Sequence, residues 1–373
     1  MRPLSDITVL DLTVNLPGPF CSMTLADLGA RVIKVEPPGG DPVRRTSPGI
    51  YASLNRGKES IALDLKTGAD RETLAALAKG ADVVLEGWRP GVAERLGADH
   101  ATLSRGNGSL VYCSISGFGQ DGPWRDRPGH DLNYLALAGY LGVQSIIEGR
   151  PWPPPVLVSD LASGLYAAIM VLAALNGRQR SGEGTFIDLS MTEAAVSLLG
   201  PDIGQIGRGP QKPPNVTSIP HYGVFQCADG RWFSLGIVHE DHFWARFCAS
   251  AGLDDLAALK FDERMAQQRQ IVERLEVVFR GLTAEEWEQR LEEHDVPGAV
   301  VIGLEQVLDS PQLVSRGIFS DIGPDRFVAQ PARLSGKRPG PRGGPPELDE
   351  HGPSLKNEFR STPAAAAQPS RDV

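Results

Sequence analysis

The first half of the chain alternates short runs of β-branched and other apolar residues with longer segments of helical character. Four apolar runs predict buried strands, and they cover Ile7–Leu12, Arg31–Val35, Asp82–Leu85 and Leu110–Ile115. Helical stretches lie between them, among them Cys21–Leu28 and Asp70–Ala78. Because strands that alternate with helices form right-handed βαβ units, the pattern predicts an α/β domain with a Rossmann-like parallel sheet.

The usual nucleotide signatures of such folds are missing from the sequence. No GxGxxG motif follows Leu12 and no GxxxxGK[ST] motif occurs, which argues against an ordinary NAD dehydrogenase or P-loop enzyme. The GxSxG motif of the α/β-hydrolases is also absent. The first loop reads Asn15-Leu16-Pro17-Gly18-Pro19 instead.

The pattern changes near residue 201. Residues 201–222 are polar and rich in Gly and Pro, which predicts a linker. Beyond it, Val224–Gln226 and Trp232–Leu235 flank an Asp-Gly turn and predict a hairpin. Helices are then expected at His242–Ala251, Asp262–Leu282 and Ala284–His294, the last with a capping box formed by Thr283 and Glu286.

Charge narrows the class of partner. The chain has 373 residues and a formal net charge of −9, which argues against a nucleic acid or an anionic membrane surface. Residues 31–66 nevertheless carry seven basic side chains against four acidic ones. Basic groups near the carboxyl ends of parallel strands suit a small anionic ligand.

Cysteine spacing and hydropathy bear on the compartment. The four cysteines are scattered with no CxxC spacing, so we expect buried thiols and no zinc site. The first residues lack the basic-then-apolar pattern of a signal peptide. The apolar run Leu161–Leu175 is shorter than the roughly 20 residues that a membrane span needs, and it predicts a buried helix. We expect a cytoplasmic protein without a membrane partner.

Three segments carry side chains suited to chemistry. His130 follows a Gly- and Pro-rich loop and precedes an apolar helical segment, Tyr134–Leu141, where a histidine is either structural or a general acid or base. Asp160 precedes the run 161–175, where it either caps the helix or presents a partly desolvated carboxylate. The segment 239–244 lacks the HExxH pattern and a third spaced ligand, so no metal site is expected.

In collinear order over about residues 4–335, the sequence resembles the family III CoA-transferase and α-methylacyl-CoA racemase superfamily. The motifs that carry this resemblance are Pro17-Gly18-Pro19, Leu28–Glu36 (LGARVIKVE), Asn55-Arg56-Gly57-Lys58, Leu63–Lys66 (LDLK), Arg89–Gly97 (RPGVAERLG), Ser116–Pro123 (SGFGQDGP) and Asp160.

The resemblance implies an interlocked homodimer. Each chain would contribute a large CoA-binding α/β domain, built from residues 1–200 and completed by about 325–360. The smaller α+β domain would span residues 223–324, after the linker, and residues 361–373 would form a disordered tail.

The resemblance also implies where CoA lies. CoA would enter as part of the substrate, with no prosthetic group, and would bind on the large domain. The matching positions are Asn15, Leu16, Pro17, Lys66, Gly87, Trp88, Arg89 and Arg95. Many relatives carry an arginine directly after the residue that matches Glu36, whereas this chain has Pro37, so Arg44 or Arg45 is the candidate for that phosphate contact.

The segment Gly129–Tyr134 (GHDLNY) resembles the racemases of the superfamily. In these enzymes the residues that match His130 and Asp160 face opposite sides of the substrate α-carbon. Transferases use the aspartate as a nucleophile and usually lack the histidine. The glycine run that formyl-type transferases carry after the hairpin is also absent from residues 234–238.

Both departures favour a racemase acting at C2 of 2-methylacyl-CoA thioesters. The reaction would be a 1,1-proton transfer through an enolate, which backbone N–H groups near Asp160 would stabilise. Glu240, or His239 in its place, would lie beside His130. The alternatives are a CoA-transferase that forms an Asp160 anhydride and then an aspartyl-CoA thioester, or a CoA-binding protein without catalysis.

Overall fold

The computed structural model describes residues 2–206 and 219–360. The described residues form two compact units, residues 2–199 with 312–360 and residues 200–206 with 219–311. Most of the predicted linker, as well as the predicted disordered tail, lies outside the described residues.

A six-stranded sheet forms the centre of the first unit, with the strand order β3-β2-β1-β4-β5-β6. All its neighbouring strands pair in parallel, which confirms the predicted Rossmann-like sheet. The strands are β1 (Thr8–Asp11), β2 (Arg31–Glu36), β3 (Glu59–Ala62), β4 (Val83–Glu86), β5 (Val111–Ser116) and β6 (Thr185–Ser190). The order reverses between β1 and β4, and ligands of open α/β sheets bind at such a switch point, at the carboxyl ends of the strands.

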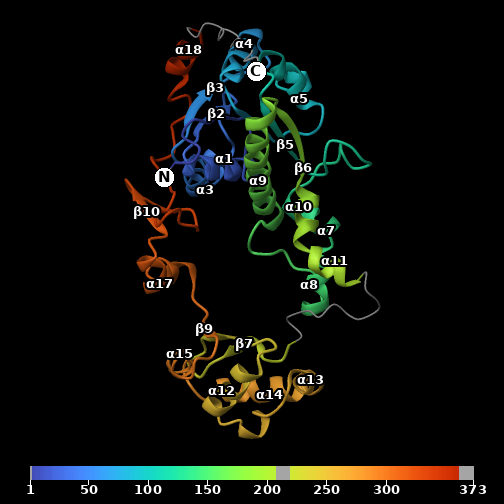
Figure 1. Ribbon diagram of the computed structural model, residues 1–373, viewed down its shortest axis with the longest axis vertical. Coiled ribbons are helices and arrows are strands. Elements are labelled where there is room, and N and C mark those ends of the chain that lie inside the picture. Colours follow the sequence, from blue (N-terminus) through green and yellow to red (C-terminus); the bar gives the residue numbers. More distant parts are fainter. Residues whose placement is uncertain (1, 207–218, 361–373) are drawn as a thin grey trace, which may run out of the picture. The chain divides into compact units, whose positions relative to one another are not determined.

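Helices cover both faces of this sheet (Figure 1). On one face α1 (Pro17–Asp27) and α9 (Val158–Ser181) pack against each other and bury Leu25 and Val171 against Val9, Val83 and their neighbours. On the other face α4 (Gly68–Lys79) and α18 (Gly352–Arg360) cover a second apolar cluster. The remaining helices of this unit include α2 (Val43–Thr46), α3 (Pro48–Asn55), α5 (Val92–Leu96), α6 (His100–Leu103), α7 (Asp131–Leu137), α8 (Tyr140–Glu148) and α10 (Met191–Leu198).

The C-terminal segment returns to this unit after the second one. It forms α17 (Pro311–Ser315) and an antiparallel pair, β10 (Phe319–Ile322) and β11 (Asp325–Val328). Further on, the Asp349 carboxylate accepts a hydrogen bond from the Ala62 amide at 2.8 Å, and His351 Nδ1 accepts one from the Ser60 amide at 3.2 Å. These bonds cap the outer edge of β3.

The second unit has a three-stranded antiparallel sheet, β7 (Tyr222–Gln226), β8 (Trp232–Gly236) and β9 (Gly298–Val300). The predicted hairpin and the capping box at Thr283 are confirmed. The helix predicted over 262–282 is two helices, because Gln267 has a non-helical conformation that ends the first of them. The helices are α11 (Gly200–Ile206), α12 (Asp241–Ala251), α13 (Phe261–Ala266), α14 (Gln268–Phe279), α15 (Ala284–Glu293) and α16 (Leu304–Val307).

The apolar run at 161–175 lies in the longer helix α9, which has 24 residues. The expectation that it is too short to cross a membrane is therefore wrong, because within the described residues α9 is the one helix that is long and apolar enough to do so. It packs against α1, α7, α10, β5 and β6, so it serves as a core helix of the first unit.

Candidate active site

A cavity of about 370 Å³ opens beside the carboxyl ends of β1 and β2. Lys66 and Trp88, two of the predicted CoA-binding residues, line it together. Its other walls are largely apolar and include Leu12, Val14, Pro37, Pro38, Leu63 and Leu96. This size and lining are typical of a small-molecule site, and the indole offers a face on which a planar base can stack.

Three further predicted CoA residues follow β4: Gly87 and Arg89 lie in the loop after this strand, and Arg95 lies in α5, whereas Asn15, Leu16 and Pro17 lie where the chain passes from β1 to α1. Gly87 lies close to Thr13, two residues after β1, since a Cβ at this position would lie 3.7 Å from the Thr13 side chain. Arg89 follows it and lines a second cavity of about 310 Å³, and Arg95 is exposed at the end of α5. Neither arginine forms an ion pair with any residue that the structure describes. Both guanidinium groups are therefore available to a ligand.

Most of the basic side chains in residues 31–66 are already paired. Each of five ion pairs joins one of them to a carboxylate: Arg31–Glu59 at 2.7 Å, Lys34–Asp41 at 3.0 Å, Arg44–Glu36 at 2.7 Å, Arg56–Asp27 at 2.7 Å and Lys58–Asp11 at 3.0 Å. Only Arg45 and Lys66 lack such a pair among the described residues. The excess of basic residues in this segment is thus used mainly in ion pairs within the protein, contrary to the expectation that it attracts an anion.

Arg44, the first candidate for the phosphate contact, is held on three sides. Its guanidinium donates to both oxygens of Glu36, at 2.8 and 2.7 Å, and to the Pro346 carbonyl at 3.0 Å. It also lies over the Tyr51 ring, 4.1 Å from the centroid. A phosphate contact from Arg44 would require these bonds to break, whereas Arg45 is exposed.

His130 and Asp160 stand at the starts of two neighbouring helices. His130 is the residue before α7, its amide donates to Asn133 Oδ1 at 3.0 Å, and its side chain is exposed. Asp160 lies in the first turn of α9. It is the third residue of this helix, and Leu157 is the residue that precedes the helix. The interpretation of Asp160 as the helix-capping residue is therefore wrong, because α9 begins earlier than the sequence predicts.

Asp131 links the starts of these two helices by hydrogen bonds. Its buried carboxylate oxygen Oδ1 accepts hydrogen bonds from the Ser159 amide at 2.7 Å, the Ser159 hydroxyl at 2.8 Å and the Asp160 amide at 3.2 Å. Asp131 directly follows His130, so one short segment carries a candidate base and fixes the helix that carries the other. This role is not apparent from the sequence, although Asp131 lies within the GHDLNY segment.

The surroundings of Asp160 change its acidity. Burial, and secondly the negative charge of Asp131, raise the pKa of Asp160 to about 7. Burial and the charge of Asp160 in turn raise the pKa of Tyr134 to about 12, an effect that Arg89 opposes. Tyr134 donates to the Gly129 carbonyl at 2.5 Å. The structure therefore places Tyr134 within electrostatic reach of both Arg89 and Asp160, and the Asp160 carboxyl can gain or lose a proton near neutral pH.

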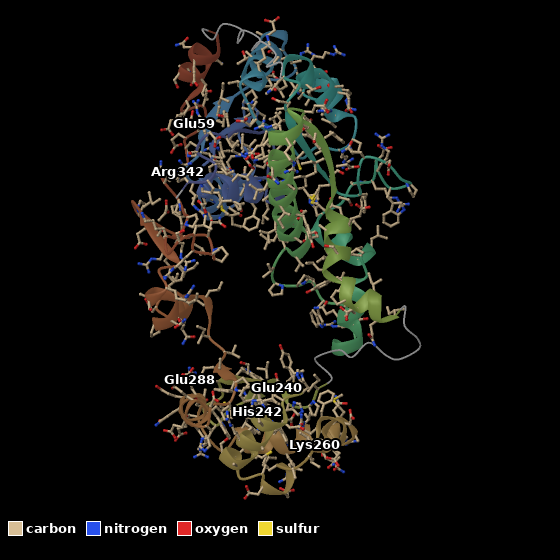
Figure 2. The ribbon with its side chains drawn as sticks, in the orientation of Figure 1. Glu59, Glu240, His242, Lys260, Glu288 and Arg342 are labelled. Carbon is tan, nitrogen blue, oxygen red and sulfur yellow. The ribbon has the colours of Figure 1, made fainter. Side chains whose placement is uncertain are left out.

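Glu240 belongs to the second unit, where it precedes α12 (Figure 2). Its carboxylate accepts a hydrogen bond from the Val238 amide at 2.9 Å, and hydrogen bonds from its own amide and that of Val238 lower its pKa. Its place beside His130, or that of His239, stays a prediction. Among the described residues no group of three or more potential ligands could hold a metal ion.

Comparison with known proteins covers nearly the whole chain. Residues 4–352 match the family model described as CoA-transferase family III. The acetyl-CoA:oxalate CoA-transferase of Acetobacter aceti is 33% identical over 97% of each chain, and the α-methylacyl-CoA racemase of Homo sapiens is 32% identical over 95% of this chain and 93% of its own. The crystal structure of a CAIB/BAIF family protein from Brucella suis has a TM-score of 0.86 at 29% identity and covers 96% of this chain and 99% of its own.

Proposed function

The chain belongs to CoA-transferase family III, and from this premise we propose that it is a racemase that inverts C2 of 2-methylacyl-CoA thioesters. The relatives show that the chain is an enzyme of the superfamily that includes CoA-transferases and α-methylacyl-CoA racemases. The observation that carries the racemase proposal is the position of His130 and Asp160 at the starts of two helices, which hydrogen bonds to Asp131 join.

Inversion needs one base on each face of the α-carbon. The thioester makes the α-proton removable but only weakly acidic, so one base must take it while the other, already protonated, delivers a proton to the opposite face. A carboxyl with a pKa of about 7 suits this work, because both of its protonation states are populated near neutral pH. In the proposed mechanism Asp160 serves one face and His130 the other.

The developing enolate also needs hydrogen-bond donors. The backbone N–H groups expected to serve are those nearest Asp160, but the amides of Ser159 and Asp160 both donate to Asp131. This part of the expected mechanism is therefore corrected: these two amides position the helix, and the enolate must find its donors among other groups of the site.

CoA transfer is the second candidate, and the names of the relatives favour it. A succinyl-CoA:mesaconate CoA-transferase of Haloarcula hispanica is 34% identical over 96% of each chain. In such a reaction the ionised Asp160 would attack the acyl-CoA carbonyl and form a mixed anhydride, with CoA as the leaving group. A pKa of about 7 keeps much of the carboxyl protonated at neutral pH, which suits proton transfer better than nucleophilic attack.

One incubation separates the two reactions. A single epimer of a 2-methylacyl-CoA is supplied without any free carboxylic acid, and the products are resolved by chiral chromatography. We expect both epimers to appear. If the epimer stays pure, while an added acid acquires CoA through a hydroxylamine-sensitive intermediate, the protein is a transferase.

Replacing Asp131 by asparagine is expected to shift the pH profile of kcat/KM. The amide retains an oxygen for the bonds from Ser159 and Asp160, but it removes the negative charge that helps to raise the pKa of Asp160. Loss of that charge favours the ionised carboxylate, so the pKa of Asp160 falls. The unmodified protein should have a bell-shaped profile, since one of the two bases must carry a proton and the other must not. In the variant, the limb of the profile that reports Asp160 should move to lower pH. An unmoved profile would show that Asp131 does not tune this group.

Arg44 and Arg45 form a matched pair of substitutions. Arg45→Ala is expected to raise KM for acyl-CoA severalfold without lowering stability, because its exposed guanidinium has no ion pair among the described residues. Arg44→Ala removes the two bonds to the buried Glu36 and is expected to lower the free energy of unfolding by about 1–3 kcal/mol. Steady-state kinetics and denaturant unfolding of both variants check the assignment, which the opposite pattern would overturn.

A homodimer is part of the proposal. The apolar side chains of Leu165, Ile169 and Met170 follow one side of α9 and are 48, 56 and 44% exposed, which is unusual for a core helix. A second copy of the chain would cover them. Light scattering should therefore give about twice the chain mass of 40.0 kDa, and a monomer at micromolar concentration would contradict the dimer.

A further inference from the structure

Four buried charges cluster around β1 and β2. Asp11 ends β1, Lys34 lies in β2, Asp41 follows β2 and Lys58 precedes β3; we call these four residues the charge quartet. They form two ion pairs, Lys34–Asp41 and Lys58–Asp11, each of 3.0 Å, and all four side chains are inaccessible to solvent. Burial alone would raise the pKa of Asp11, but the ammonium groups of Lys58 and Lys34 outweigh burial and hold that pKa below its usual range.

The Lys34–Asp41 pair is hydrogen-bonded to the loop that connects β1 to α1. Lys34 Nζ donates to the Thr13 carbonyl at 3.0 Å, and Asp41 Oδ1 accepts a hydrogen bond from the Asn15 amide at 3.3 Å. Asn15 has a φ of 66°, in the left-handed region that non-glycine residues seldom adopt. The pair therefore holds a residue in a conformation that its own backbone disfavours.

The Lys58–Asp11 pair holds the same loop from its two ends. Asp11 Oδ1 accepts from the Thr13 amide at 3.0 Å, and Asp11 Oδ2 accepts from the Ser22 hydroxyl of α1 at 2.5 Å. Lys58 Nζ donates to the Pro19 carbonyl at 3.2 Å, and to Ser22 and Asn55. Both the exit of β1 and the first turn of α1 are thereby tied to one ammonium group.

The loop held in this way borders the proposed CoA cavity. Leu12 and Val14, on either side of Thr13, line the cavity with Lys66 and Trp88. Buried ion pairs are seldom more stabilising than apolar side chains of the same volume. Stability alone is therefore a weak reason for two buried ion pairs in one core. Fixing the loop at the switch point of the sheet is a more specific reason for them.

We propose that the charge quartet positions residues 13–17 for CoA, with Lys34 and Asp41 as the positioning residues that set the conformation of Asn15. The inference rests on the proposed binding of CoA, but not on the choice between racemase and transferase. The quartet side chains bond to the loop and are inaccessible to solvent, so their effect is expected in CoA affinity rather than in the chemical step.

The test replaces the charged pair by apolar residues of similar size, Lys34→Met/Asp41→Leu. Calorimetric titration with CoA itself should give a Kd raised by about tenfold or more, because a displaced loop misplaces every contact that it makes. KM for acyl-CoA should rise in parallel while kcat stays within about twofold, and the unfolding midpoint should fall little. If the double variant does not fold, Lys34→Met/Asp41→Asn keeps the shape and an acceptor for the Asn15 amide, and a smaller rise in Kd is expected.

The matched control is the buried pair Arg56–Asp27, which joins the other end of α1 to the C-terminal segment. Arg56→Met/Asp27→Leu should leave the Kd for CoA unchanged, whatever it does to stability. A folded Lys34/Asp41 variant with the Kd of the unmodified protein would overturn the inference, as would an equal loss of affinity in the control. If the unmodified protein itself binds no CoA, the proposed function fails instead.

Discussion

Replacing Asp160 by asparagine is expected to lower kcat for epimerisation by about 10²–10⁴-fold. The amide has nearly the shape of the carboxylate, and the backbone bond from residue 160 to Asp131 survives, so the start of α9 should not move. What is lost is the group that carries a proton on one face of the α-carbon, and general acid–base catalysis contributes about this factor. Steady-state rates with one epimer, together with a CoA titration, should give a low kcat and a Kd for CoA within about threefold of the unmodified protein.

The structure offers a matched control for this substitution. Glu286 occupies the same position in α15 that Asp160 occupies in α9, three residues after the residue that precedes the helix. Glu286→Gln tests what the loss of a first-turn carboxylate does to a helix of this protein outside the candidate site. A kcat within about fivefold of normal for Asp160→Asn would remove this residue from the chemistry.

His130→Gln is expected to stop epimerisation to a similar extent, about 10²–10⁴-fold in kcat. The glutamine cannot take up a proton. The side chain at this position is exposed, and the hydrogen bond from the backbone amide of residue 130 to Asn133 is kept, so the loss of activity should not come from a folding defect. His294→Gln, at the exposed end of α15 in the second unit, is the control and should have no effect.

This substitution also separates the two candidate functions. A transferase would need Asp160 and not His130, so it would lose activity in one variant and keep it in the other. Unchanged turnover after His130→Gln would therefore exclude the two-base mechanism even if Asp160 proves essential.

The strands that the sequence predicts are those at the centre of the sheet. β1, β2, β4 and β5 are buried on both faces, and each contains a run of β-branched or other apolar residues. The two strands that it misses, β3 and β6, lie at the edges. β6 (TFIDLS) buries few of its side chains and β3 (ESIA) is short and half polar, so neither has the pattern of a central strand.

The sequence offers candidate site residues but not the interactions that position them. Lys66 and Trp88 meet at one cavity as the resemblance implies. A count of charges could not tell that Arg44 and Lys58 are paired, because their partners, Glu36 and Asp11, lie 8 and 47 positions away in the sequence. Nor could it find the bond between Asp131 and α9, which joins residues 28 positions apart.

The exchange of the α-proton with solvent tests the central claim most directly. One epimer of a 2-methylacyl-CoA is incubated with the protein in D2O, without any free acid, and both epimers are analysed by mass spectrometry. We predict that the opposite epimer forms and that it carries one deuterium at C2, delivered by the base on the far face. Recovery of the starting epimer alone, without deuterium, under conditions in which the same preparation transfers CoA to an added carboxylic acid, would contradict the account.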